Sequence, residues 1–93
     1  MSPPADADSH SYPHTVSLSF DYDDERRARL VTDAVAVEVG EIDDDRSTAT
    51  VSRDGHTLHV EVFARDLVAL RAGANTWLGL VATAEDVCAL AAC

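Results

Sequence analysis

The sequence contains no lysine at all. It has seven arginines and 17 acidic residues, so the chain of 93 residues carries a formal charge of −10. Binding of nucleic acid by a protein on its own rests on cationic contacts to phosphates, which weaken steeply as salt rises, so this charge argues against free-standing DNA or RNA binding. An acidic surface without lysine is typical of proteins from a salt-saturated cytoplasm, where the Debye length is about 3 Å at 1 M salt. The acidity is therefore interpreted as halophilic adaptation, and any role that involves nucleic acid would need partner proteins.

Long hydrophobic runs are also absent. The longest nearly uncharged stretch, Ala72–Ala84, has 13 residues, whereas a membrane-spanning helix needs roughly 20. No basic segment followed by an apolar one opens the chain, so no export signal is expected. We therefore expect no membrane partner and a cytoplasmic location.

Cysteine is scarce, with two in the chain. Cys88 and Cys93 are five residues apart in the last expected helical turns, so their side chains would project in different directions, and no CxxC spacing is present. The spacing predicts two reduced thiols.

The length allows one domain. Apolar residues make up 46% of the chain and charged residues 26%, which is typical of a folded protein. We expect a flexible tail over residues 1–13, rich in Pro, Ser, Asp and Ala, and a single domain over residues 14–93. Because a chain this short buries only roughly 60 to 65% of its unfolded surface, an oligomer is expected.

The first half of this domain predicts a strand and a helix. Residues His14–Phe20 alternate between apolar and polar, the period of a half-buried strand. Asp23 is the predicted N-cap of a helix that Gly40 ends, with apolar residues at helical spacing between them. The β-branched run Val35, Val37 and Val39 leaves a strand open as an alternative.

A hairpin is expected after a charged loop at Glu41–Asp45. Its turn is Asp54-Gly55, a strong type I′ signal, and its arms are Ser47–Arg53 and His56–Phe63.

The last helix is predicted to begin after the N-cap Asp66. Its apolar positions recur at helical spacing, and other apolar residues extend around the helix, so we expect part of its surface to be buried against another chain. The apolar positions at helical spacing are Leu67, Leu70, Ala74, Trp77, Leu78 and Val81. A new cap at Thr83–Glu85, before final turns at 86–93, leaves a kink or a continuous helix open.

The predicted fold class is α/β (α+β) in two layers. A three-stranded, mainly antiparallel sheet carries two helices on one face, in the order strand-helix-strand-strand-helix. The open sheet edges invite strand addition from a second subunit.

No constellation for catalysis, a cofactor or a metal emerges from the sequence. His56 and His59 are three apart in a strand and so fall on opposite faces. The acidic run that begins at Asp21 has Arg26 where a calcium loop requires glycine. Phosphate-binding and nucleophile motifs are absent, so we predict no catalytic residue, no cofactor and no metal.

The segment after Asp66 is the most informative. Arg71 and Asn75 are i and i+4 on a helix, so their side chains share a face. One interpretation is that this face binds a partner. The alternative is that Arg71 pairs with an acidic side chain on the surface and that Asn75 has no specific role. The sequence here resembles the small dimerisation subunit of the KEOPS complex, in the CTAG/Pcc family, over about residues 14–92. The signature maps onto Asp66, Leu70, Arg71, Ala72, Asn75, Thr76 and Leu78. Gly79 stands where that family has a basic residue, and Val37-Glu38 stands where it has Pro-Glu.

The resemblance implies a non-catalytic scaffold in the complex that makes threonylcarbamoyladenosine in tRNA. It implies pairing through the sheet, with an identical chain or a paralogue, and docking of the helices on the transferase subunit, so that the dimer bridges two transferase copies and supports tRNA binding only within the complex. The residues expected at the partner interface are Leu67, Leu70, Arg71, Ala72, Ala74, Asn75, Thr76, Trp77, Leu78 and Val81. The alternatives are a free-standing RNA- or ligand-binding α/β module and an unrecognised small enzyme.

Overall fold

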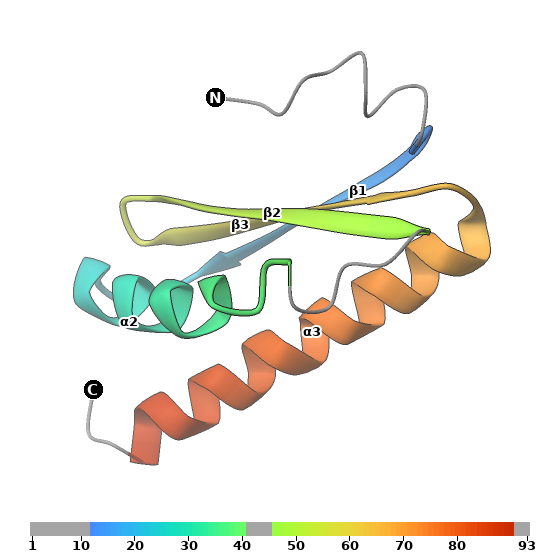
Figure 1. The fold of residues 1–93 in the computed structure, drawn as a ribbon. Helices are drawn as coiled ribbons and strands as arrows, with labels where there is room; N and C mark the ends of the chain where they lie inside the picture. The colour runs from blue at the N-terminus through green and yellow to red at the C-terminus, as the bar shows by residue number, and fades with distance from the viewer. Residues whose placement is uncertain (1–11, 41–45, 91–93) are drawn as a thin grey trace.

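The computed structural model describes residues 12–40 and 46–90. Five elements follow one another along these residues (Figure 1): β1 (His14–Asp21), α2 (Glu25–Ala36), β2 (Ser47–Asp54), β3 (Thr57–Ala64) and α3 (Leu67–Leu90). The order confirms the predicted strand-helix-strand-strand-helix arrangement. Residues 1–11 of the tail expected over 1–13, and the loop expected at 41–45, lie outside the described residues.

The three strands form one antiparallel sheet in the order β1-β3-β2, so β3 is central. The β2–β3 hairpin closes one residue later than predicted: Asp54 still belongs to β2 and pairs with Thr57, so the two turn residues are Gly55 and His56 rather than Asp54 and Gly55. Gly55 has a φ of 63° there, a conformation that glycine adopts without the clash a Cβ would bring. Alternate residues of β3 are buried on the helix side of the sheet, as period-2 alternation predicts.

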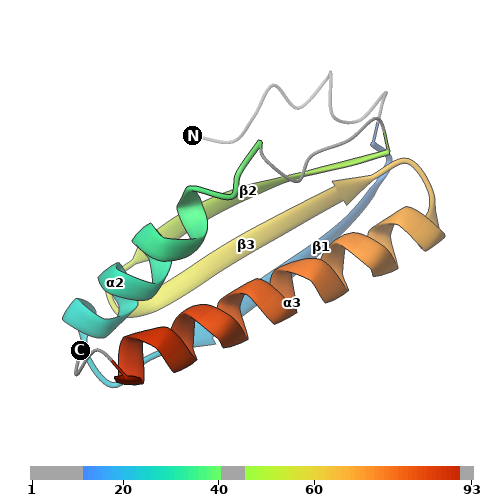
Figure 2. The ribbon, with the colours of Figure 1, turned by 60° about the horizontal axis from the view of Figure 1, so that its bottom comes forward.

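Both helices cover the same face of the sheet. Figure 2 shows α2 over the β2 side and α3 over the β1 side, with β3 between them; α2 contacts β2 and β3, and α3 contacts all three strands. The core between these layers is apolar. Its fully buried large side chains are Trp77, Leu58, Val31, Val35, Val60, Val62 and Val81. The two-layer α+β fold class is confirmed.

The start of α2 differs by one residue from the sequence expectation. The N-cap is Asp24, not Asp23: Asp24 has extended backbone angles, and its Oδ1 accepts a hydrogen bond of 2.8 Å from the Arg27 N–H. The two aspartates are adjacent and chemically equal as caps, so only the point where the backbone turns helical chooses between them.

The end of α2 also differs. The helix ends at Ala36, four residues before the predicted stop at Gly40, and the residues between form turns. Gly40 has a φ of 87°, so it ends the turn rather than the helix. The alternative strand over Val35, Val37 and Val39 does not form, because Val35 is buried in the core as a helical residue.

Helix α3 runs without interruption from Leu67 to Leu90, so the possible new cap at Thr83–Glu85 is a continuation. The helix lies very close to the sheet at Gly73. A Cβ built there would lie 2.9 Å from the Val62 Cγ1 atom, closer than real side chains approach. No helix in the described ranges, α3 included, has the length and apolarity needed to cross a membrane.

Cys88 is disulfide-bonded, so the prediction of a reduced thiol is wrong for this residue. That prediction rested only on the spacing of the two cysteines in the sequence, and spacing alone does not decide whether a thiol is oxidised. The prediction for Cys93 lies outside the described residues.

Candidate functional site

Helix α3 divides the predicted interface residues between the core and the surface. Trp77 and Val81 are only 2% and 1% exposed, while Leu70 and Ala74 are half-buried. The expectation that Trp77 and Val81 contact a partner is therefore corrected, because the chain's own sheet and α2 cover both side chains. The spacing of apolar residues in the sequence does not distinguish the side of α3 that faces the sheet from the side that faces solvent.

The remaining predicted residues are exposed on α3. Leu67 and Leu78 are 66% and 44% exposed, which leaves large apolar side chains in water. The smaller and polar members of the set are also exposed: Arg71, Ala72, Asn75 and Thr76. The Thr76 hydroxyl donates to the Ala72 carbonyl oxygen at 2.9 Å. The ion pairs found among the described residues do not include Arg71, so the pairing expected if Arg71 had only a structural role is not seen there.

Asp66 holds the start of α3, as predicted. Its carboxylate accepts a hydrogen bond of 2.8 Å from the Ala69 N–H and two of 3.0 Å from the Arg46 guanidinium. The Ala69 N–H, followed by Arg46, lowers the pKa of Asp66 below its usual value of 3.8. The residue therefore links the beginning of β2 to the helix that carries the exposed signature residues.

A groove of about 210 Å³ runs between the two helices. We call it the interhelical groove and define it by Ala34, Val35, Glu38, Leu80, Thr83, Ala84 and Val87. Its walls are mainly apolar, and Val87 remains 58% exposed. Such a surface suits an amphipathic helix laid between two others. The sequence analysis missed it because its two walls are about 50 residues apart in the chain, and only the packing of α2 beside α3 brings them together.

The opposite side of α3 is tied to the end of β1. The Tyr22 hydroxyl donates a hydrogen bond of 2.6 Å to Oε2 of Glu85. Burial, followed by the hydrogen bond and the charge of Glu85, raises the pKa of Tyr22 above its usual value. This contact fixes the second half of α3 against the strand-to-helix connection.

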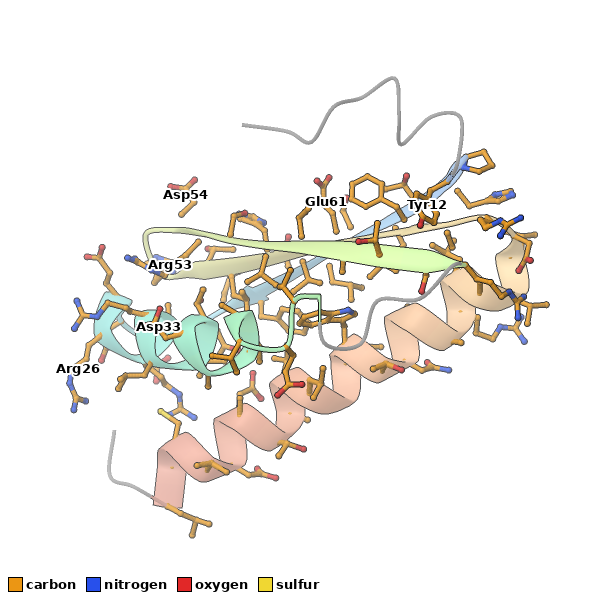
Figure 3. The ribbon with its side chains drawn as sticks, viewed as in Figure 1. Tyr12, Arg26, Asp33, Arg53, Asp54 and Glu61 are labelled. Carbon is orange, nitrogen blue, oxygen red and sulfur yellow. The ribbon has the colours of Figure 1, made fainter. Side chains whose placement is uncertain are left out.

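The face of the sheet away from the helices is polar. Ser17 donates to Glu61 at 3.3 Å, Ser19 and His59 lie 3.1 Å apart, and Thr57 donates to Asp21 at 2.6 Å. Figure 3 shows Glu61 projecting from this face, away from both helices. Within residues 12–40 and 46–90, no three potential metal ligands of the His, Cys, Asp or Glu type gather at one point.

Comparison with known proteins gives a family and a fold. The model of a family described as "Transcription factor Pcc1" matches residues 15–89, most of the chain. Among solved structures, one chain of the "Crystal structure of binary complex Gon7-Pcc1" is similar, with a TM-score of 0.75 and 19% identity over 86% of this chain and 98% of that chain. No curated protein matches significantly. The family match confirms the resemblance carried by the α3 signature. The chain belongs to the Pcc1 family, that of the small KEOPS subunit.

Proposed function

We propose that this chain is the scaffold of a KEOPS complex, without catalytic activity of its own, and that it bridges two copies of the transferase subunit that makes threonylcarbamoyladenosine in tRNA. It acts in the cytoplasm, at the high salt to which its charge is adapted, and it pairs through its sheet as a dimer. The observation that carries the proposal is the apolar surface left over after folding: the interhelical groove, with Val87 58% exposed at its wall.

The groove supports docking of a helical partner because most of the side chains that line it are apolar. Leu80 and Ala84 of α3 face Ala34 and Val35 of α2, and the polar members, Glu38 and Thr83, stand among them. A partner helix that inserts apolar side chains there removes apolar surface from water at about 25 cal/mol per Å². The transferase subunit is the proposed partner because family resemblance implies it.

Contact with tRNA is assigned to the assembled complex. The chain carries a charge of −10, and at least two of its seven arginines are engaged with carboxylates, Arg46 with Asp66 and Arg53 with Glu25. A single copy therefore offers too few free cations to hold a phosphate backbone. No observation favours the alternative of a free-standing RNA-binding module.

Substitution of Val87 by Asp tests the groove. A charge placed there loses its hydration when a partner docks, so capture of the transferase should weaken roughly 30-fold or more. The folded state should persist, because the side chain already faces water. Capture of the purified transferase subunit in native salt measures the effect, and circular dichroism checks folding.

Val68→Asp is the matched control, since Val68 is 71% exposed on the same helix and lies outside the groove. It should retain capture. Equal loss in both variants, or full capture by Val87→Asp, would contradict docking in the groove.

A further inference from the structure

Glu38 is the charged residue among the described residues that line the interhelical groove, and the other six are uncharged. It follows the end of α2, where its backbone N–H donates to the Val35 carbonyl oxygen at 3.0 Å and its side chain is half-buried. In the part of the chain that the structure describes, no ion pair or hydrogen bond occupies its carboxylate. The groove therefore contains a negative charge that no described side chain neutralises.

The end of α2 gives the Glu38 carboxylate no local support. A helix carries partial negative charge at its C-terminal end, so an acidic side chain is disfavoured there. The last turn of α2 contains no basic residue. By contrast, Asp24 and Glu25 lie at the beginning of the same helix, where the dipole favours them, and Glu25 also pairs with Arg53. Stability of the single chain thus gives no reason for an acid at position 38.

Docking of a partner changes the surroundings of Glu38. The apolar walls of the groove, which include Leu80 of α3 and Ala34 of α2, are then closed off from water. A carboxylate that loses its water without gaining a cation or hydrogen-bond donors carries a large free-energy penalty. A partner helix with only apolar side chains is therefore selected against, and a helix that places a basic group at Glu38 is favoured.

High salt gives this groove an advantage over the open surface. The chain has 17 acidic residues, and at about 1 M salt the attraction between exposed charges is screened beyond about 3 Å. An ion pair enclosed in a groove is screened much less. In a salt-rich cytoplasm, an acid that becomes enclosed on docking therefore discriminates between partners better than acids on the open surface.

We propose that Glu38 determines the specificity of the groove by pairing with an arginine or lysine of the partner helix. Arginine fits best, because its guanidinium can donate two parallel hydrogen bonds to one carboxylate. Helices α2 and α3 run in opposite directions along the sheet (Figure 2), so Glu38 lies toward the Leu80 end of the groove and Val87 toward the other. The partner helix is basic at the first end and apolar at the second. This inference rests on the proposed function, in which the partner is the transferase subunit, and it adds the chemistry that this partner must carry.

Two substitutions at Glu38 measure the effect of its charge on capture. Glu38→Gln keeps the shape and removes the charge, so the dissociation constant for the purified transferase subunit should rise roughly 10-fold in native salt. Glu38→Arg places two cations together and should raise it roughly 100-fold or more. Asp33→Arg is the matched control, because Asp33 is exposed on α2 (Figure 3), does not line the groove and undergoes the same change of charge. It should bind as the wild type does.

A charge exchange tests the pairing itself. Transferase variants, each with one surface arginine or lysine changed to Glu, are measured against Glu38→Arg. One of them should bind Glu38→Arg roughly 10-fold more tightly than the wild-type transferase does. The same transferase variant should bind the wild-type chain more weakly. A residue that only shaped the end of α2 would not give this rescue, so its absence from the whole set would overturn the inference.

Two further measurements separate recognition from folding. The thermal midpoint of the free chain should be unchanged or slightly raised in Glu38→Gln, since the carboxylate has no partner among the described residues. The ratio of dissociation constants between Glu38→Gln and wild type should persist from low salt to molar salt, as expected of an enclosed pair. A lower thermal midpoint, or a ratio that falls to one in molar salt, would overturn the inference.

The outcomes distinguish this inference from the proposed function. Capture that is weakened by Val87→Asp but unchanged by both substitutions of Glu38 would overturn the inference and leave docking in the groove intact. Equal weakening by Glu38→Arg and Asp33→Arg would also overturn it, because net charge alone would then be responsible. Failure of the wild-type chain to capture the transferase would refute the proposed function and this inference with it.

Discussion

The two edge strands of the sheet, β1 and β2, differ in which helix lies over them and in how they contact it. At the β2 edge, α2 covers a small buried residue, Ala49, and Arg53 reaches across to Glu25. At the β1 edge, Val16, Leu18 and Phe20 stay half-buried, and α3 adds Leu78 at 44% exposure. The difference shows that the β2 edge is tied to α2 by an ion pair, whereas the β1 edge lies beside a helix that leaves a large apolar side chain exposed.

The two helices differ in the same sense. The buried residues of α2 form one stripe, Ala28, Val31, Thr32 and Val35, as expected of a helix that faces one sheet. Helix α3 is longer and more apolar, yet several of its large apolar side chains face water. If α3 carries more of the packing, changes beneath it should cost more stability than changes to α2.

The largest expected effect is at Trp77. Its replacement by Ala removes the largest buried side chain under α3 and should lower the free energy of unfolding by about 3 to 5 kcal/mol. Urea denaturation in native salt measures the loss. The neighbouring Thr76 is exposed, so Thr76→Ala should change stability by about 0.5 kcal/mol or less. A small loss for Trp77→Ala would mean that α3 is not anchored through this residue.

The close seat of α3 on β3 predicts the next effect. Gly73→Ala would place a Cβ about 2.9 Å from Val62 Cγ1, so α3 must shift, at a cost of about 1 to 3 kcal/mol. A Cβ added at Gly79 would meet no atom within 4 Å, and Gly79→Ala should instead stabilise the helix by up to about 1 kcal/mol. Thermal unfolding of the two variants should move in opposite directions. A shared sign would argue against the close packing at Gly73.

The cap of α2 gives a smaller effect. Asp24→Ala removes the acceptor of the Arg27 N–H and should cost about 1 kcal/mol. Asp23→Ala, one residue earlier, should cost little. The denaturation midpoints of the two variants show which aspartate caps the helix. Equal losses of stability in both variants would contradict Asp24 as the single N-cap.

The smallest expected effect concerns Tyr22 and its pH dependence. Tyr22→Phe removes the 2.6 Å hydrogen bond to Glu85 and should cost about 0.5 kcal/mol, the low end for a partly exposed bond. Folding raises the pKa of Tyr22 above its usual 10.0, so its stabilising contribution is full below pH 10 and declines as the pH rises beyond that value. Stability profiles of wild type and variant should therefore converge above pH 10. Parallel profiles across that range would show that the tyrosine ionises freely in the folded chain.

Local patterns were sufficient for most of the fold. Alternation located β1 and the hairpin, the Asp54-Gly55 pair located the turn to within one residue, and Asp66 located the start of α3. Each depends on interactions within a few residues, which sequence spacing encodes directly. The ends of α2 were harder, because Asp23 and Asp24 are equivalent in composition and the run to Gly40 is compatible with helix or turn.

The candidate site was less predictable than the fold. The predicted interface residues on α3 combine core residues with surface residues, since Trp77 and Leu78 are adjacent in sequence and differ in burial. When apolar residues lie nearly all round a helix, their spacing does not indicate which side of the helix faces the core. In the folded chain, contact with the sheet decides which side is buried.

By itself, the sequence determined the order of elements, the antiparallel hairpin, the capping aspartate of α3 and the excess of apolar residues on that helix, because all of these follow from neighbours close in the chain. Only the tertiary structure decided which residues of α3 are core and that α2 and α3 enclose a groove. These depend on packing between segments tens of residues apart, where the choice is made by the volume and charge of side chains that meet only after folding.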